Sequence, residues 1–347
     1  MNSCNISSNN IGIKLNNYTE AEKHYIVTYL NTEIAKQLTI RRVSGNVQQK
    51  LTVSEICHIP IPVFNDDFYK LISYLILKSE EARKKSFNSF SLAESNLLSA
   101  FGIDNVTDTS ETIAIKSLSD SYSASGRLDA EYYQPKYEKI DSMIKQYSGG
   151  YDYVKNLCTF RDENYIPLST KEYKYVELSN INAYGQVTDC TIGNGETLPT
   201  RARRIVKTND VIVSSIEGSL QSCALVESTY HNAICSTGFY VINSTKFNPE
   251  TLLLLFKSAP IQNLLKKGCS GTILTAISKN ELGNIPLPLI EDSVQKEIAD
   301  KIQESFSLRK HSNDLLERAK TAVEMAIEQG EETALGWLQE MDKNQCD

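Results

Sequence analysis

The chain has 347 residues, of which 41% are hydrophobic and 23% charged, and its formal net charge is −7. This is the composition of a globular protein, and the length suits two or three domains of roughly 150 residues each. No apolar run approaches the roughly 20 residues that a membrane span needs, and the first residues lack the basic and apolar regions of a signal peptide. We therefore expect a cytoplasmic protein that does not interact with a membrane.

The charges and cysteines limit which kinds of site the chain can contain. Eight cysteines are scattered without a Cys-x-x-Cys pair, so we expect buried, reduced thiols and no metal site. The negative net charge argues mildly against nucleic-acid binding. However, residues 201–207 hold four cations, and a local basic face can coexist with acidic helices elsewhere.

The first hundred residues predict helices and one extended segment. We expect a helix over 20–38, a turn at 41–45, and a helical turn within 51–59 that begins at Thr52, with Glu55 three residues later as in a capping box. Residues 59–62 must be extended, because each proline disfavours a helix at itself and at the residue before it. A long helix is then predicted over about 66–102.

This long helix has small and apolar residues at alternating steps of four and three, which indicates a seam between paired helices. The positions are Phe68, Ile72, Leu75, Ser79, Ala82, Ser86, Ser89, Ala93 and Leu97. A second seam runs through Val294, Ile298, Lys301, Ser305, Leu308, Ser312, Leu315, Ala319 and Val323. Two matched helices favour antiparallel pairing with each other; the alternative is that each lies on its own domain.

Between the two helices the pattern changes. Residues 104–126 are polar and rich in Ser and Thr, which predicts a linker, and residues 127–147 predict a helix. Short β-branched and aromatic runs follow, which predict strands at 173–178, 211–215, 224–226 and 239–242. A helix is expected over 249–267. The fold class predicted from these elements is α+β.

Residues 25–98 and 251–324 are two copies of one pattern, offset by 226 positions without a gap, as from Ser44 to Ser270. Identical pairs include Gly45 with Gly271 and Pro60 with Pro286. The copies are longer than the roughly 20–50 residues of a solenoid repeat. A module made of part of a domain and its long helix has therefore been duplicated, and the first copy is expected to be incomplete.

Motifs for catalysis are absent from the sequence. The phosphate-binding loop GxxxxGK[ST], the dinucleotide fingerprint GxGxxG and the four-residue motif of amino-methyltransferases do not occur. Asp162, Glu172 and Lys174 match the spacing of a metal-dependent nuclease, but such triplets are common by chance. We expect no catalytic residues, no cofactor and no metal.

Two motifs resemble a known family. Residues 127–133 read Arg-Leu-Asp-Ala-Glu-Tyr-Tyr, and residues 270–272 read Ser-Gly-Thr, followed by Ile-Pro-Leu-Pro at 285–288 and a long helix. Together with the repeat, they resemble the DNA specificity subunit of type I restriction–modification systems over about residues 1–330. This resemblance implies mixed α/β target recognition domains, and two long antiparallel coiled-coil helices that act as a spacer and dock the methyltransferase subunits.

The resemblance also implies a domain division and a set of partners. Residues 1–63 would be the remnant of a first recognition domain, 64–103 the first spacer helix, 104–126 a linker, 127–289 a complete recognition domain, 290–330 the second spacer helix and 331–347 a tail. The partners would be double-stranded DNA, the methyltransferase (modification) subunit and, through the complex, the restriction motor and nuclease subunit. The specificity subunit itself would be non-catalytic.

Other functions stay open from the sequence. The chain could be a recognition subunit, or half of one, in a type II-like fused nuclease and methyltransferase system, with a homodimer as one arrangement. It could be an enzyme whose site carries no known motif. It could also be a structural remnant that no longer reads DNA.

DNA binding needs cations for phosphates and short polar or bidentate side chains for base edges. We expect phosphate contacts from the cationic segment and from the basic pair before the Ser-Gly turn, a placement that Arg41 and Arg42 repeat in the first copy. The candidate DNA-binding residues are Arg201, Arg203, Arg204, Lys207, Ser219, Gln221, Ser236, Thr237, Lys266, Lys267, Ser270 and Thr272.

Overall fold

The computed structural model describes residues 10–44, 50–102, 113–271 and 275–343. It is a mixed helix and sheet structure, as the sequence predicts, with a pair of long helices packed together. The chain divides into two compact units: unit 1 comprises residues 1–87 and 307–347, and unit 2 comprises residues 88–306. Residues 103–112 of the expected linker lie outside the described residues.

Unit 1 is helical. It contains α1 (Glu20–Leu30), α2 (Glu33–Ile40), α3 (Val53–Ile56), α12 (Glu331–Lys343) and parts of two long helices, α4 (Asp66–Ala100) and α11 (Asp292–Gln329). Its core joins aromatic side chains of α1 and α4 to alanines of α11 and α12. The rings of Tyr25 and Tyr69 lie 4.9 Å apart, as do those of Phe64 and Phe68.

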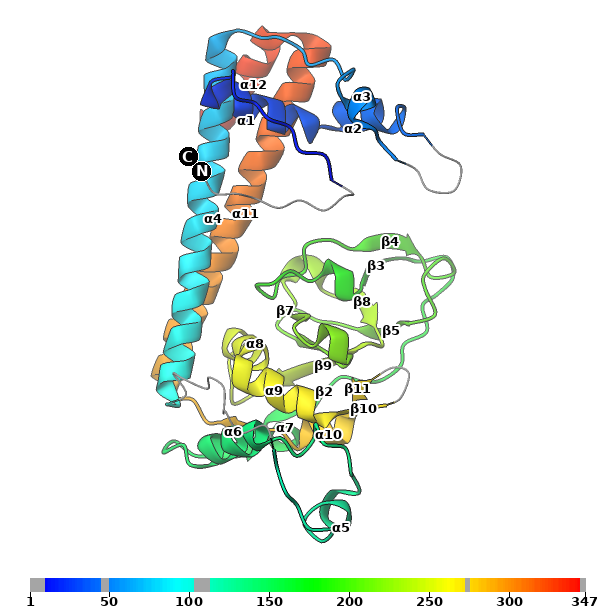
Figure 1. Cartoon of the computed structure of the whole chain (residues 1–347), viewed down its shortest axis with the longest axis vertical. Coiled ribbons are helices and arrows are strands. Elements are labelled where there is room, and N and C mark those ends of the chain that lie inside the picture. The colour runs from blue at the N-terminus through cyan, green and yellow to red at the C-terminus, as the bar shows by residue number, and fades with distance from the viewer. Residues whose placement is uncertain (1–9, 45–49, 103–112, 272–274, 344–347) are drawn as a thin grey trace. The chain divides into compact units, whose positions relative to one another are not determined.

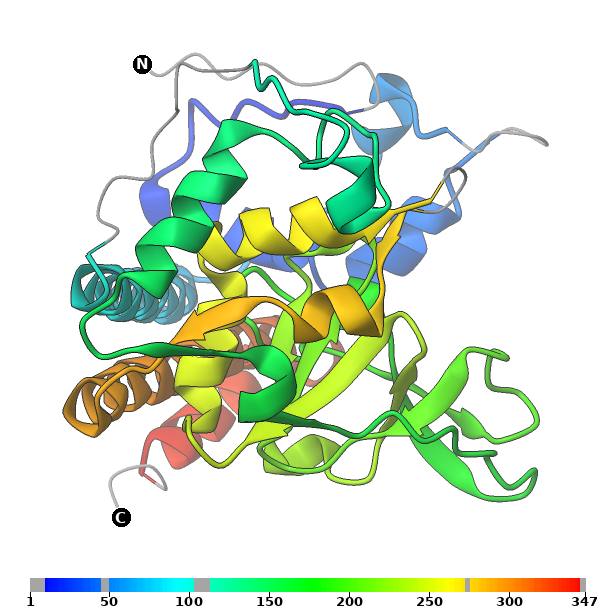
Figure 2. The same ribbon diagram turned by 90° about the horizontal axis from the view of Figure 1, so that it is seen from below.

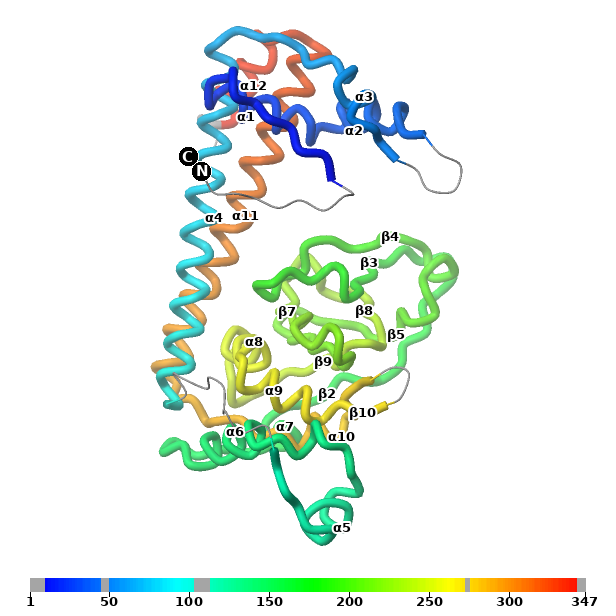
Figure 3. Tube along the Cα trace, viewed as in Figure 1, coloured from blue at the N-terminus to red at the C-terminus, as the bar shows by residue number. Residues whose placement is uncertain are grey.

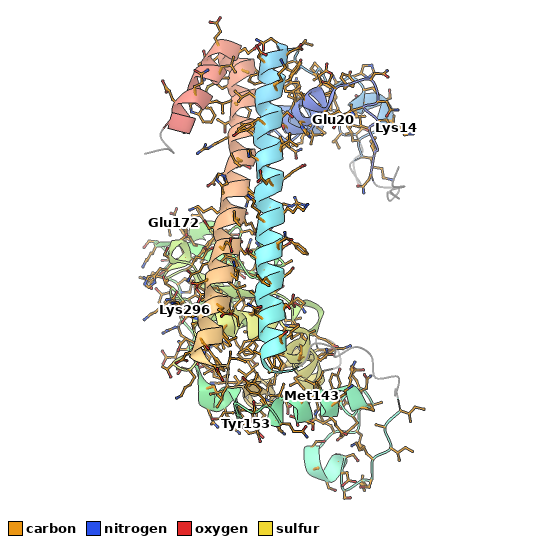
Figure 4. All side chains as sticks on the ribbon, turned by 90° about the vertical axis from the view of Figure 1, so that its left-hand side faces the viewer. Lys14, Glu20, Met143, Tyr153, Glu172 and Lys296 are labelled. Carbon is orange, nitrogen blue, oxygen red and sulfur yellow. The ribbon has the colours of Figure 1, made fainter. Side chains whose placement is uncertain are left out.

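The two long helices run side by side (Figures 1 and 4). Within unit 1 they are antiparallel, because Asn65, before α4, donates its N–H to the Glu331 carboxylate (3.2 Å), whereas Ser79, further along α4, contacts Ser312, earlier in α11. The hydroxyl oxygens of Ser79 and Ser312 are 2.8 Å apart, and each hydroxyl also bonds the backbone carbonyl of the other residue. Small residues thus allow the close approach that the seam predicts.

The predicted seam of α4 is confirmed, since all nine of its positions are buried. The predicted seam of α11 is partly wrong. Lys301 and Leu308 are half-buried, whereas Ile302 and Phe306 are buried in the core. The reason is that α11 up to Phe306 is part of unit 2, where Ile302 and Phe306 belong to the core with α8 and α9, so its apolar face is wider than a two-helix seam.

Unit 2 contains two four-stranded sheets. One has the order β2-β9-β6-β7, from β2 (Cys158–Phe160), β9 (Phe239–Ser244), β6 (Val211–Ser214) and β7 (Cys223–Leu225), all antiparallel. The other has the order β4-β3-β8-β5, from β4 (Thr191–Asn194), β3 (Glu172–Val176), β8 (Ile234–Ser236) and β5 (Ala202–Ile205). In this sheet β3 and β8 are parallel.

A helical layer completes unit 2. It consists of α6 (Pro135–Lys145), α7 (Val154–Leu157), α8 (Pro249–Lys257), α9 (Ala259–Gly268) and α10 (Lys279–Gly283). Strand β1 (Tyr151–Tyr153) pairs antiparallel with β12 (Pro286–Pro288), and α6 packs against both α9 and β12 (Figure 2). Apolar residues of α6, α8 and α9 form one core with the sheet β2-β9-β6-β7. The remaining elements are α5 (Tyr122–Ser125), the short hairpin β10 (Cys269–Ser270) with β11 (Ala276–Ile277), and three 3₁₀ turns at Leu178–Asn180, Glu217–Ser219 and Ser228–Tyr230.

The structure reproduces the sequence repeat element by element. With the offset of 226 positions, α1, α2, α3 and α4 correspond to α8, α9, α10 and α11. The isolated β-bridge between Ser44 and Lys50 corresponds to the Ser270–Ala276 pair of the β10–β11 hairpin. The duplicated module is therefore a pair of short helices, a hairpin or bridge, a helical turn, a proline-rich extended segment and a long helix.

Three helix predictions need correction. The helices expected over 20–38 and 249–267 are each broken in two, at Thr32 and at its counterpart Ser258, both of which are extended N-cap residues. The helix expected from residue 127 begins only at Pro135. Pro135 occupies the first turn, where a missing N–H has no cost, and the residues before it are held by the contacts of Arg127 described below.

Candidate nucleic-acid interface

Four loops of unit 2 are connected by backbone hydrogen bonds, and one of them is the turn that leads from β8 in one sheet to β9 in the other. Thr237 N–H donates to the Arg201 carbonyl (2.9 Å), Ser215 N–H to the Gly238 carbonyl (2.8 Å), and Ile277 N–H to the Ser215 carbonyl (2.8 Å). Glu217 N–H donates to the Thr275 carbonyl (3.0 Å). We call the described residues of these four loops, 199–201, 214–219, 237–238 and 270, 271, 275 and 276, the loop rim. The neighbouring strands β5 and β9 are labelled in Figure 3.

One end of the loop rim brings two candidate residues together. Arg201 and Thr237 are both exposed and are joined by their backbone hydrogen bond. Ser219 lies in the next loop, half-buried, where its hydroxyl contacts the Ser214 hydroxyl (3.1 Å) and donates to the Ile216 carbonyl (3.3 Å). This end offers one guanidinium and small hydroxyl groups, which are the chemical groups that contact phosphates and base edges.

Arg127 holds the other end of the loop rim. Its guanidinium donates to the carbonyl oxygens of Cys269 (2.9 Å) and Lys267 (3.4 Å) and forms a fork with the Asp129 carboxylate (2.7 Å for each pair of atoms). The guanidinium keeps the pKa of Asp129 below its ordinary value. Arg127 therefore fixes the start of the β10–β11 hairpin, and Ser270 stands exposed on it. Thr272 lies outside the described residues.

The two lysines before this hairpin have different environments. Lys266 is exposed, and its ammonium lies 3.5 Å from the Glu131 carboxylate. Lys267 is half-buried, with its ammonium 4.8 Å from the centre of the Tyr132 ring, and Arg127 lies over the same ring at 4.4 Å. Burial lowers the pKa of Lys267. Both lysines line a cavity of about 640 Å³ with Arg127, Glu217 and Ser270, so its charges are mixed.

The other three cations of the basic segment, Arg203, Arg204 and Lys207, differ in their burial and their contacts. Residues 202–205 form strand β5, which was not predicted because its sequence is a cluster of charges. Arg203 is half-buried and donates to the Thr200 carbonyl (2.9 Å). Arg204 lies over Tyr240 (5.5 Å), and two of its guanidinium nitrogens are buried without a hydrogen bond. Lys207 is exposed in a turn where its backbone N–H donates to Asp210.

Two further DNA-binding candidates, Ser236 and Gln221, have contacts within unit 2. Ser236 is buried, and its hydroxyl accepts the Gly238 N–H (3.2 Å), which shapes the β8–β9 turn. Gln221 is exposed, and its carbonyl accepts a hydrogen bond from the Lys257 ammonium of α8 (3.0 Å). Arg127 and Tyr132 were not among the candidates, although the Arg-x-Asp spacing of their motif was a usable signal.

The three residues whose spacing matches a metal-dependent nuclease are exposed or have other partners. Asp162 pairs with Lys279, Glu172 is exposed at the start of β3, and Lys174 donates to the Thr229 carbonyl (2.9 Å). The described part of the chain contains no group of three or more His, Cys, Asp or Glu side chains that could hold a metal ion. Among the same residues, no helix is both long and apolar enough to span a bilayer.

Comparison with known proteins gives resemblances to solved structures only. The sequence matches no protein-family model and no curated protein. The HsdS subunit from Thermoanaerobacter tengcongensis is 26% identical over 52% of this chain and 47% of its own, with a TM-score of 0.39. A chain from a structure of type I R-M complex assembly and conformational transition is 27% identical over 51% of this chain and 46% of its own, with a TM-score of 0.39.

A third resemblance covers more of the chain. The type I restriction–modification S subunit from M. genitalium is 13% identical over 86% of this chain and 71% of its own, with a TM-score of 0.42. The parts matched in the first two structures amount to about half the length of those proteins.

Proposed function

We propose that this chain is a DNA specificity subunit of a type I restriction–modification system, with residues 127–289 as the target recognition domain. The observation that carries the proposal is the duplicated module, which the sequence and the structure display with the same offset and which ends each time in a long helix of the antiparallel pair. Arg127 of the Arg-Leu-Asp-Ala-Glu-Tyr-Tyr motif donates to the carbonyl of Cys269, the residue just before the Ser-Gly-Thr motif; the family resemblance rests on these two motifs.

The loop rim is the proposed DNA-reading surface. Arg201 would contact phosphate, while Thr237, Ser219 and Ser270 would lie near base edges or the sugar–phosphate backbone. Arg127 would act as a positioning residue, because its guanidinium is bound to the Asp129 carboxylate and to the carbonyls of Lys267 and Cys269. Lys266 and Lys267 would support the hairpin. We leave Ser236, Gln221 and Arg204 out of this surface because of their burial or their other contacts.

The long helices would serve as spacer and as the docking surface for methyltransferase subunits, and the restriction subunit would join through that complex. Stable protein interfaces bury more than about 1,000 Å², an area that the outer faces of two helices of 35 and 38 residues can supply. Lys84 and Lys310, exposed on these faces, would lie near the partner. The chain itself would carry no catalytic group.

A binding and methylation experiment tests this proposal. The purified chain alone should transfer no methyl group; together with its methyltransferase subunit it should methylate adenine at one defined sequence. Replacing Arg201 by Ala should lower the slope of log affinity against log salt by about 0.9, the value for one lost phosphate contact. Lys207→Ala, an exposed cation outside the loop rim, is the matched control and should keep the slope. Methylation without sequence preference, or equal effects of both variants, would refute the proposal.

A further inference from the structure

The two copies of the module differ in what covers their extended segments. Ile61 is 41% exposed, whereas its counterpart Leu287 is fully buried. Val63 is 86% exposed, whereas its counterpart Leu289 is half-buried. The chain therefore contains, as an internal reference, a covered version of a surface that unit 1 leaves open.

The cover in unit 2 is one continuous segment, the helix α6 followed by the strand β1. Tyr137, Ile140 and Ile144 of α6 are fully buried, and α6 packs against α9 and β12 (Figure 2). Strand β1 runs antiparallel to β12 with Asp152 opposite Leu287. Two flanking hydrogen bonds, from Val154 N–H to the Ile285 carbonyl and from Leu289 N–H to the Gly150 carbonyl, are both 3.0 Å long.

The same edge of the extended segment is open in unit 1. In a strand, successive backbone groups point to opposite edges. The carbonyls of Pro60 and Pro62 point to α1, where they accept hydrogen bonds from the hydroxyls of Tyr29 (2.6 Å) and Tyr25 (2.8 Å). None of the hydrogen bonds among the described residues uses the backbone groups of Ile61 or the N–H of Val63. An unpaired edge of this kind is a template for strand addition.

The core residues that α6 and β1 accompany in unit 2 have mostly apolar counterparts in unit 1. Leu264, Leu265, Leu282, Ile285 and Leu287 of α9, α10 and the segment up to β12 belong to the same core as the apolar residues of α6. Their counterparts in unit 1 are Leu38, Thr39, Ile56, Ile59 and Ile61. Four of the five counterparts are aliphatic. Ile59 is buried in the unit 1 core, whereas Leu38 on α2 and Ile61 stay partly exposed. Apolar side chains therefore remain on α2 and the extended segment for a helix–strand segment to cover.

We propose that α2 and residues 59–63 form a docking site for a helix–strand segment of the α6–β1 kind, supplied by a partner polypeptide. The amphipathic helix of the partner lies on α2, and its following strand pairs antiparallel with residues 60–62 in the register that β1 uses on β12. This inference rests on the internal repeat and is independent of DNA binding. A second copy of this chain is a poor donor, because its own α6 and β1 already cover its β12.

A peptide of residues 135–157 of this chain, labelled with a fluorophore, is a direct probe for the full-length protein. It should bind saturably and slow the hydrogen exchange of the Ile61 and Val63 amides. Ile61→Glu should weaken binding roughly tenfold or more, because a carboxylate would be buried without a partner. Leu77→Glu is the matched control. Leu77 is exposed like Ile61 (53% against 41%), but its counterpart Gln303 is exposed too, so binding should stay unchanged.

A control peptide with Ile140→Asp and Ile144→Asp should not bind, and Trp337, the single tryptophan and part of the unit 1 core, reports whether each variant stays folded. Absence of protection at Ile61 and Val63 at the highest peptide concentration would overturn the proposal. So would equal weakening by Leu77→Glu, which would indicate unspecific apolar adhesion. Protection of these amides by self-association without peptide would assign the face to a second copy and would also overturn it.

Discussion

The module at residues 20–100 and the module at residues 249–329 share their backbone elements but differ in burial. Val27 on α1 is 55% exposed, whereas its counterpart Leu253 on α8 is fully buried, because α8 packs against β6, β7 and β9. Unit 1 buries only one face of α1, with Tyr25, Ile26 and Tyr29, against α4, α11 and α12, and the counterparts of these residues are buried in unit 2 as well. The comparison separates two causes: local sequence sets where the helices begin and end, and the neighbouring layer decides which of their faces leave water.

The largest expected effect comes from placing the same substitution in both copies, at Leu287 and at Ile61. Leu287→Asp should destabilise unit 2 by about 4 kcal/mol or more, because it removes a fully buried side chain and buries a charge. Ile61→Asp should cost under about 1 kcal/mol in the free chain, since the site is exposed. Hydrogen exchange of the β6 amides measures the first effect, and urea denaturation followed by Trp337 fluorescence measures the second. Similar losses in both copies would contradict the assignment of burial to the neighbouring layer.

The repeat and the helical seam could be predicted from sequence because both depend on spacing along the chain. Thr32 and Ser258 were missed as helix breaks because apolar residues continue on both sides of them. Strand β5 was missed because Arg203 and Arg204 stand where a half-buried strand usually has apolar residues; a register shift opposite β8 and stacking of Arg204 on Tyr240 accommodate them. These outcomes depend on contacts between segments distant in sequence.

The next largest effect is expected from a substitution in the contact between the two long helices. Ser79→Leu should destabilise unit 1 by about 2–3 kcal/mol, because a large side chain cannot fit where Ser79 and Ser312 bond each other's carbonyls. Ser95→Leu, at an exposed position of the same helix, is the control and should change the stability by no more than about 0.5 kcal/mol. Urea denaturation of unit 1, followed by Trp337 fluorescence, measures the first, and hydrogen exchange of α4 measures the second. A tolerated Ser79→Leu would mean that the helices are not in close contact in solution.

The candidate site was less predictable than the fold. Sequence alone indicated cations and small polar residues near turns, and Arg201, Thr237 and Ser270 are indeed exposed on the loop rim. It could not indicate that Ser236 is buried, since a two-residue turn places one hydroxyl inward and the next residue outward. Nor could it show that Arg127 is committed to the carbonyls of residues 267 and 269, a contact across 140 residues of chain.

The smallest expected effect tests whether local sequence alone sets where the short helices of both modules begin. Thr52 accepts the Glu55 N–H (3.3 Å) at the start of α3, and its counterpart Ser278 accepts the Glu281 N–H (3.2 Å) at the start of α10. Because a cap acts on its own helical turn, Thr52→Ala and Ser278→Ala should each cost about 1 kcal/mol, in the open module and in the covered one alike. Thr52→Ser keeps the hydroxyl and should restore the stability. Hydrogen exchange of the α3 and α10 amides measures both costs. If the loss at Ser278 exceeded that at Thr52 by more than about 1 kcal/mol, the covering layer would govern even the caps, and the division between local and tertiary causes drawn from the repeat would fail.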